Sequence, residues 1–283
     1  MRLLSTIILF FLLVRSPMGE AAPVLKVDAS SVMNALPADP YLEVWEDESK
    51  QASIHDLLKT PPIFRDLSVE PPQAMGYSKA IFWIRFHIEN TSDVEQRIYL
   101  EATDPQQYLD FFALDPVTQQ IVDRQSIGSF RPISQQRFKY RFPVLEVIAR
   151  PGLQTFYFRL DVVSVTFPYS FWTKDELLEK ASWDRTALAF FFGCFTIMAL
   201  YHLLLGLTTK RLEYFLYVGY LISFILLQMF VTGSGSLYFG DAWTLPNQGV
   251  AVWITMTIIF TLQFSISFLR LGPERLNLIR WTL

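Results

Sequence analysis

Hydrophobic and polar residues alternate through the middle of the chain, from about residue 24 to residue 180. Successive side chains of a β-strand face opposite sides of the sheet, so this alternation predicts strands with one buried face. The pattern is clearest in residues 81–90, which read IFWIRFHIEN. One face of this strand is apolar and the other is mixed: Phe82, Ile84, Phe86 and Ile88 against Trp83, Arg85, His87 and Glu89.

Further alternating segments follow, separated by Pro, Gly, Asn and Asp. They predict strands at residues 97–102, 108–114, 121–127, 137–142, 156–160 and 165–171. Before Lys174, only residues 53–58 have a helical pattern. Short strands joined by turns are typical of antiparallel sandwiches, so we expect an all-β, jelly-roll-like sandwich over residues 22–180.

Three long runs without a charged residue occupy the last third of the chain, at residues 187–207, 214–231 and 249–269. Each is long enough for a helix to cross the hydrocarbon core of a bilayer. The runs therefore predict an α-helical transmembrane bundle. Residues 175–185 have a helical composition and enter the first run without a Gly or Pro. A continuous helix there would couple the sandwich mechanically to the membrane.

The charges of the connecting loops predict the orientation. Lys210 and Arg211 lie between the first two runs, whereas residues 232–248 contain no Lys or Arg. Because basic loops stay in the cytoplasm, the 232–248 loop is expected outside and the short tail, residues 270–283, inside. Residues 1–21 combine Arg2, an uncharged run and small residues before Ala22, which is typical of a cleaved signal peptide. An uncleaved N-terminal anchor is the alternative interpretation.

Composition narrows the class of protein. The 283 residues are 51% hydrophobic and 18% charged, yet only Lys210, Arg211, Glu213 and Asp241 are charged between residues 187 and 269. This uneven distribution excludes an ordinary cytosolic enzyme and a disordered chain. Cys194 is the single cysteine, so no intrachain disulfide can form. A net charge of −3 gives no reason to expect nucleic acid as a partner.

Several short motifs resemble a known receptor family. They are residues 82–90, YRFP at residues 140–143, Pro151-Gly152, Phe158-Arg159, residues 193–202 and YFLY at residues 214–217. Together they resemble the bacterial seven-transmembrane receptors with diverse intracellular signalling modules, and the sandwich resembles their second type of extracellular domain. The resemblance extends from about residue 41 to residue 269.

The resemblance implies an export signal, a carbohydrate-binding-like jelly-roll sensor domain and seven spans in the bacterial inner membrane. It also implies a cytoplasmic output module, such as a diguanylate cyclase or a histidine kinase. The chain instead ends at Leu283 after three expected spans and carries no output domain. We therefore expect a member truncated after three spans, either a gene fragment or a shortened product.

Residues that would indicate catalysis are sparse. His55, His87, His202 and Cys194 are scattered without metal-ligand spacing, and no glycine-rich phosphate loop or nucleophile elbow is present. Asp104, Asp110 and Asp115 lie near turns, where they cap strands more readily than they form a glycosidase pair. We expect no enzyme, no cofactor and no metal. His202 near the end of the first run is expected to hydrogen-bond a neighbouring helix or to reach the membrane interface.

Two strands offer candidate ligand-binding residues. Trp83 with Arg85, and Tyr157 with Arg159, each place an aromatic ring two residues before an arginine. If the strands share a sheet, rings and guanidinium groups on one face would suit a carbohydrate or a small metabolite. The alternative is cross-strand packing of arginine against aromatic rings. Tyr169 and Trp172 form a second candidate patch, in which core packing is the expected role of Tyr169.

These observations favour a sensory membrane receptor whose sandwich binds a ligand and relays it through the helices. A homodimer or a cytoplasmic signalling partner would receive the signal. One alternative is a membrane-anchored binding or adhesion module without signalling. Another is a fragment of a polytopic enzyme or transporter, which would show charged or broken spans.

Overall fold

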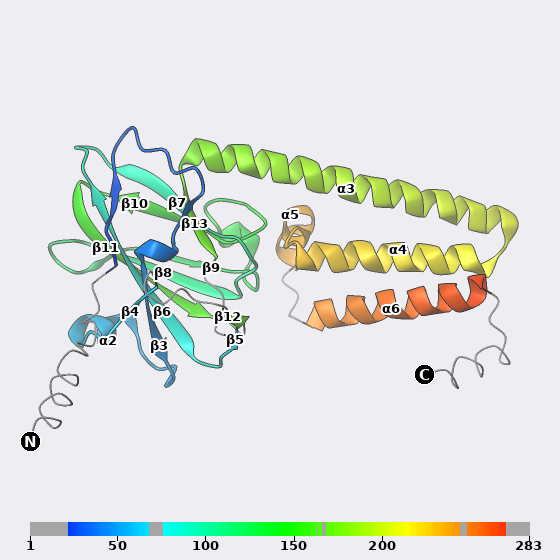
Figure 1. The fold of residues 1–283 in the computed structure, drawn as a ribbon, viewed down its shortest axis with the longest axis horizontal. Helices are drawn as coiled ribbons and strands as arrows, with labels where there is room; N and C mark the ends of the chain where they lie inside the picture. The colour runs from blue at the N-terminus through cyan, green and yellow to red at the C-terminus, as the bar shows by residue number, and fades with distance from the viewer. Residues whose placement is uncertain (1–21, 68–75, 163, 166–167, 244–247, 270–283) are drawn as a thin grey trace, which may run out of the picture.

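The computed structural model describes residues 22–67, 76–162, 164–165, 168–243 and 248–269. The expected signal peptide and the expected tail lie outside the described residues. The described part is a β-sandwich followed by long helices, as Figure 1 shows. The prediction of an all-β sandwich followed by apolar helices is confirmed.

The larger sheet has seven strands, in the order β4-β3-β6-β11-β8-β9, with β1 parallel to the end of β6. Its strands are β1 (Leu25–Val27), β3 (Leu42–Asp47), β4 (Arg65–Asp66), β6 (Ile81–Asn90), β8 (Tyr108–Leu114), β9 (Ile121–Ile127) and β11 (Gly152–Asp161). All the other neighbouring strands in this sheet are antiparallel. The predicted strands 81–90, 108–114 and 121–127 have the bounds that the sequence pattern gives.

The smaller sheet has four strands in the order β10-β7-β13-β2. They are β10 (Val144–Ala149), β7 (Gln96–Ala102), β13 (Tyr169–Trp172) and β2 (Leu36–Pro37). A separate pair joins β12 (Ser164–Val165) to β5 (Gly76–Tyr77). The finer description of the sandwich as a jelly roll stays a prediction.

The inner faces of the two sheets form the main core. Phe82, Ile84, Phe86 and Ile88 of β6 are all fully buried, as the alternation predicts. The Phe86 ring stacks on Phe156 of β11 with ring centroids 5.3 Å apart. The smaller sheet contributes apolar side chains from alternate positions of its three longest strands: Ile98, Leu100, Ala102, Leu145, Val147, Ala149, Tyr169 and Phe171. The predicted residue pattern therefore sets which face of each strand is internal.

The outer face of the larger sheet carries a second, smaller core beneath helix α2 (Ile54–Lys59). Ser53 caps this helix: its hydroxyl accepts from the Asp56 amide, and the Asp56 carboxylate accepts from the Ser53 amide. Ile54 and Leu57 face the sheet and are buried. The α2 helix, predicted at residues 53–58, thereby covers part of a sheet face that would otherwise meet water.

Two predicted strands differ from the structure. Residues 137–142 form no strand; instead Tyr140 and Phe142 pack on the outer face of the smaller sheet. The alternation of aromatic residues here reflects which side chains are buried. It does not require the backbone to form strand hydrogen bonds, so the predicted strand was wrong. The segment 165–171 contains the end of β12 and the start of β13, with Pro168 just before β13. Proline has no amide hydrogen to donate to a strand ladder.

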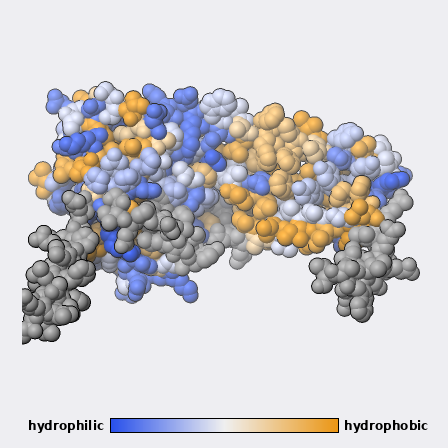
Figure 2. Space-filling view, in the orientation of Figure 1, coloured by the Kyte–Doolittle hydropathy of each residue, from blue (hydrophilic) through white to orange (hydrophobic). Residues whose placement is uncertain are grey.

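The helical part consists of α3 (Lys174–Thr209), α4 (Leu212–Val231), the short α5 (Gly235–Phe239) and α6 (Gln248–Phe268). α3, α4 and α6 contain the three described segments that are long and apolar enough to cross a membrane. α4 runs beside both α3 and α6 (Figure 1). In Figure 2, apolar residues cover much of the helical part, whereas polar and apolar residues are mixed on the sandwich. α4 and α6 pack closely: a Cβ on Gly219 of α4 would lie 2.6 Å from the Phe260 ring of α6.

We predict that Phe86→Ala lowers the free energy of unfolding by about 3–5 kcal/mol, because it leaves a cavity between the two sheets. The measurement is denaturant unfolding of the purified chain in detergent, followed by tryptophan fluorescence. The matched control is Val117→Ala, at a position that is 87% exposed. A loss no larger than that of the control would contradict the assignment of Phe86 to the core.

Candidate functional site

The four predicted ligand-binding residues come together on the outer face of the larger sheet. β6 and β11 are antiparallel neighbours, with Tyr157 opposite Arg85 and Arg159 opposite Trp83. The two strands therefore share a sheet, which was the condition for the predicted site. Rings and guanidinium groups alternate in a compact group of four.

The two rings of this group are buried by other side chains. Trp83 is 1% exposed and stacks on Phe112, with ring centroids 5.9 Å apart. Tyr157 is 9% exposed and meets Phe64 edge to face. The faces that would stack on a sugar are thus occupied by protein groups, whereas the side chains of Arg85 and Arg159 stay about one quarter exposed. The arginines are the members of the group that reach solvent.

Arg85 and Arg159 are each held by a carboxylate. Arg85 Nε lies 2.5 Å from Glu43 Oε2, and its guanidinium lies over the Phe64 ring. Arg159 Nη1 lies 3.7 Å from Asp110 Oδ2, and Asp110 also receives a bidentate pair from Arg131. Burial alone would raise the pKa of Asp110, but the bonds from Arg131 and Ser126 lower it below its usual value. These pairs fix the orientation of the guanidinium groups.

Glu43 is the most strongly perturbed carboxylate on this face. Its burial opposes ionisation, but the nearby His87, with Nε2 3.8 Å from Oε2, and the hydrogen bond and charge of Arg85 outweigh burial and lower the pKa of Glu43 from 4.5 to about 2. The Glu43 side chain is only 4% exposed. The carboxylate is therefore ionised at neutral pH and anchors β3 to β6.

The second candidate patch divides between two roles. Tyr169 is 2% exposed and packs against Phe158 in the main core, as expected. Trp172 lies on the other side of β13, beneath the ammonium group of Lys180, 4.9 Å from the ring centroid. Lys180 belongs to α3, so this ring marks the place where the first long helix meets the sandwich.

The first turns of α3 are built into the sandwich. Leu177 and Ala181 are buried against Tyr99 and Val144 of the smaller sheet. Two charged residues lie on the same side of the helix. Lys180 donates a hydrogen bond to Glu101, which is fully buried. Asp184 accepts hydrogen bonds from Tyr140 and Arg141. Burial, followed by the bond to Asp184, raises the pKa of Tyr140 well above its usual value. The sequence pattern did not identify these pairs, because their members are far apart in the chain.

A second set of contacts joins the sandwich to the segment that follows α4. This segment includes Gly233, before α5, and Asp241, just after α5. The Ser134 amide and hydroxyl donate to Asp241, at 3.0 and 2.7 Å. Gly233, with φ of +67°, lies against the sandwich segment that contains Arg141. A Cβ at this position would lie 2.7 Å from the Arg141 carbonyl oxygen. The sandwich thus touches the bundle at α3 and at the α4–α5 turn.

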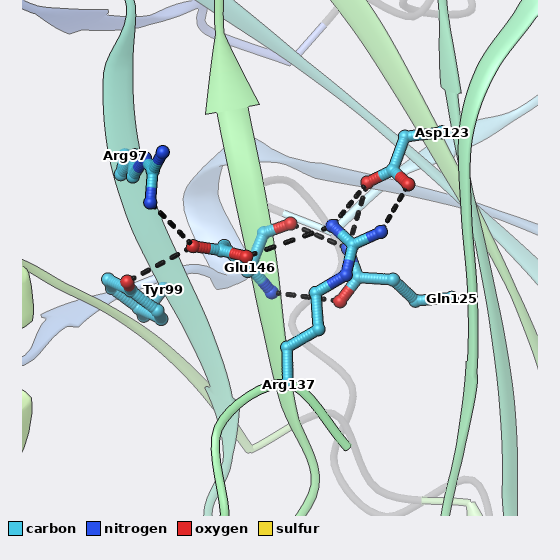
Figure 3. Close-up of polar contacts among 6 residues, drawn as sticks. All are labelled: Arg97, Tyr99, Asp123, Gln125, Arg137 and Glu146. Carbon is cyan, nitrogen blue, oxygen red and sulfur yellow. Dashed lines mark hydrogen bonds and ion pairs between the residues drawn. The ribbon is translucent and has the colours of Figure 1, made fainter. Parts of the chain in front are cut away.

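Figure 3 shows a polar cluster that closes the edge of the sandwich. The Gln125 side-chain amide of β9 donates to the Glu146 carbonyl of β10 and accepts from the Glu146 amide, at 2.6 and 3.2 Å. Arg137 bridges Asp123 and Glu146 at the same edge. Since β9 and β10 belong to different sheets, one side chain supplies the hydrogen bonds that a neighbouring strand would supply. This cluster has a structural role.

The remaining chemical candidates have local partners. His202 Nδ1 lies 2.9 Å from the Met198 carbonyl oxygen, one turn earlier in α3, and its ring contacts Tyr217 of α4. The hydrogen bond of His202 therefore lies within α3, and only its ring contacts the neighbouring helix α4, so the expected interhelical bond stays a prediction. Within the described ranges, no three His, Cys, Asp or Glu side chains lie close enough to hold a metal ion.

Comparisons with known proteins agree with this architecture. The family model for the 7TMR-DISM extracellular 2 domain matches residues 39–173, and the model for the 7TM diverse intracellular signalling domain matches residues 184–283. The chain belongs to this family of seven-transmembrane receptors. It is a receptor-like membrane protein with a sensor-type domain outside the membrane.

No curated protein matches the chain. Among solved structures, it is similar to the crystal structure of a tail fiber protein, gp63.1, from an E. coli phage, at 8% identity and a TM-score of 0.29. That match covers 54% of this chain and 20% of the tail fiber chain, and the likeness is too weak to carry an inference.

We predict an acid-dependent loss of stability that depends on Glu43. A carboxylate whose folded pKa is lowered contributes stability above its unfolded pKa and loses it as the pH falls through the folded value. Between pH 4.5 and about 2, the free energy of unfolding should therefore fall more steeply for the wild-type chain than for Glu43→Gln. Denaturant unfolding at several pH values measures this slope. Glu48→Gln, at an exposed turn position, should keep the wild-type slope, and equal slopes in all three proteins would contradict the prediction.

We also predict that Lys180→Met destabilises the protein by about 3–5 kcal/mol, because it leaves the buried Glu101 without its cationic partner. Adding Glu101→Leu to Lys180→Met should recover most of this loss in denaturant unfolding. The control is Lys174→Met, at an exposed position in the first turn of the same helix. Equal stability of the single and the double variant would argue against the buried pair.

Proposed function

We propose that this chain is the sensing and relaying part of a signal-transduction receptor in the bacterial inner membrane. The sandwich lies in the periplasm, binds a small-molecule ligand, which we propose to be a carbohydrate or a small metabolite, and shifts the transmembrane helices. The C-terminal end lies in the cytoplasm. There the shift of the helices is passed on, either within a homodimer of this chain or to a cytoplasmic signalling partner. The family membership supports the receptor role.

The single observation that carries the relay is the continuity of α3. One uninterrupted helix, Lys174–Thr209, begins in buried contact with the smaller sheet and goes on as the first candidate span. A helix is stiff along its axis, so a displacement at Lys180 or Asp184 moves the segment inside the bilayer. Such a coupling needs a ligand that favours one of two packings of the helix.

The binding residues that we propose are Trp83, Arg85, Tyr157 and Arg159, with the arginines as the groups that touch the ligand. Their guanidinium groups are partly exposed and oriented by carboxylates, which suits hydroxyl or carboxylate groups of a ligand. The two rings are buried on the same sheet face, beside the arginines.

The unique cysteine provides a test of the relay. Cys194 is exposed in the span of α3 and accepts an environment-sensitive fluorophore without any other substitution. The purified chain in lipid nanodiscs is screened by thermal unfolding against monosaccharides, sugar acids and dicarboxylates. A compound that raises the unfolding temperature should also change the emission of the fluorophore.

Two variants separate binding from relay. Arg159→Gln should weaken binding about tenfold, whereas Arg97→Gln, an exposed arginine on the smaller sheet, should not. Thr186→Pro breaks α3 between the sandwich and the span, so binding should persist while the emission change disappears. Thr186→Ala is the control for that position.

A membrane-anchored binding or adhesion module is the second candidate function. It predicts binding without any change at Cys194 in the wild-type chain, and that result would overturn the relay.

A further inference from the structure

A cavity of about 240 Å³ lies where the sandwich meets the outer ends of the helices. Loops of the sandwich form one wall, and α4, the turn before α5 and the first turn of α6 form the other. The cavity is separate from the face that carries Trp83 and Arg85, and it adjoins α3 only through Arg141, which pairs with Asp184. Its two walls differ in chemistry.

The wall formed by the sandwich is basic. It includes Arg131 and Arg141, the two ends of a segment that has four basic residues and no acidic one, RPISQQRFKYR. Arg131 is paired with Asp110 and Arg141 with Asp184, at 2.8 and 2.9 Å. Both arginines line the cavity and neither carboxylate does. Arg131 also donates to the carbonyls of Leu109 and Ile127, which further fixes its guanidinium group. Guanidinium groups held in this way suit phosphate oxygens.

The same wall has an acceptor that lacks a donor. Gln136 lines the cavity and is 8% exposed, and its Oε1 atom is buried without a hydrogen-bond partner among the described residues. A buried acceptor without a donor costs free energy, so the site favours an occupant with a hydroxyl group near its anionic group.

The opposite wall is apolar and lies at a defined depth. Phe230 and Val231 end α4, and Val250 lies in the first turn of α6, at the outer limits of two candidate spans. The Trp243 ring packs against Phe230 and stacks on Phe239, with centroids 4.5 and 5.0 Å away. Aromatic rings at span ends are typical of the interface between hydrocarbon and headgroups. We therefore expect the cavity to lie at the level of the lipid headgroups.

We propose that this cavity binds the phosphate group of an anionic amphiphile with a hydroxylated headgroup, supplied by a phospholipid of the outward-facing leaflet. The phosphate contacts Arg131 and Arg141, a headgroup hydroxyl donates to Gln136, and the glycerol end lies against Phe230 and Val250. An occupant in this position touches both the sandwich and the bundle. The protein would then sense the composition of the membrane, or use one lipid to hold its two parts together.

The test is native mass spectrometry of the full chain in detergent, titrated with phosphatidylglycerol or with phosphatidylcholine of the same acyl chains. We expect retention of one phosphatidylglycerol at concentrations where phosphatidylcholine is not retained. Ser236→Phe fills the cavity and leaves every charge in place, and Arg131→Gln removes one guanidinium group. Each should weaken retention of phosphatidylglycerol about tenfold or more.

The matched control is Lys139→Gln, which removes a positive charge from an exposed position of the same segment. It should bind as the wild-type chain does. Equal losses in Lys139→Gln and Arg131→Gln would reduce the effect to general surface charge, and unchanged binding in Ser236→Phe would place the lipid elsewhere; either result overturns the site. Because Ser236→Phe keeps the ion pairs, it decides the question even if Arg131→Gln fails to fold.

Glycerol phosphate, added as a soluble competitor, separates the two sources of this chemistry. If it displaces the lipid at similar concentrations, the site recognises the phosphate of a free metabolite. If it does not, the site needs the acyl chains of a lipid. Binding is measured directly, without the Cys194 probe, so its failure is distinguishable from a failure of the relay.

Discussion

The α3 helix begins against the surface of the sandwich, in water, and continues into lipid without a break. This change of environment along one helix constrains which residues the sandwich and the helix can carry. Its first turns are stable because Leu177 and Ala181 are buried by the smaller sheet and because Lys180 and Asp184 find partners in Glu101 and Arg141. The later turns carry an apolar surface that only a bilayer or other helices can cover. The smaller sheet must therefore keep an apolar outer face, although outer faces of sandwiches usually meet water.

Both sheets have outer faces that are covered at least in part. The larger sheet is covered by α2, and the smaller sheet by α3 and by the segment that contains Tyr140 and Phe142. This arrangement explains why outward-facing aromatic residues are poor indicators of ligand binding in this protein. Trp83 and Tyr157 face outward from their strands, yet both are buried, because a further layer lies on that side.

The candidate site was predictable in part. Alternation in residues 81–90 and 156–160 identified the strands and the shared face of Trp83, Arg85, Tyr157 and Arg159, and the structure brings these residues together. Their carboxylate partners, Glu43 and Asp110, were not predicted as partners, since pairing depends on which strands become neighbours. The junction residues Glu101, in β7, and Arg141, in the segment before β10, gave no local signal either, because isolated charged residues are ordinary in strands and loops.

The residue pattern alone was enough to establish the division into an exported sandwich and apolar helices, the buried face of the principal strands and the helical continuity from residue 175 onward. These features depend on periodicity and on charge-free length, which are local properties of a chain. Long-range packing, in contrast, determines that residues 137–142 pack without pairing, that α3 rests on buried ion pairs, and that a basic cavity opens beside the span ends. Those features arise where segments distant in sequence meet, and the energy of a buried charge depends on its neighbours in space.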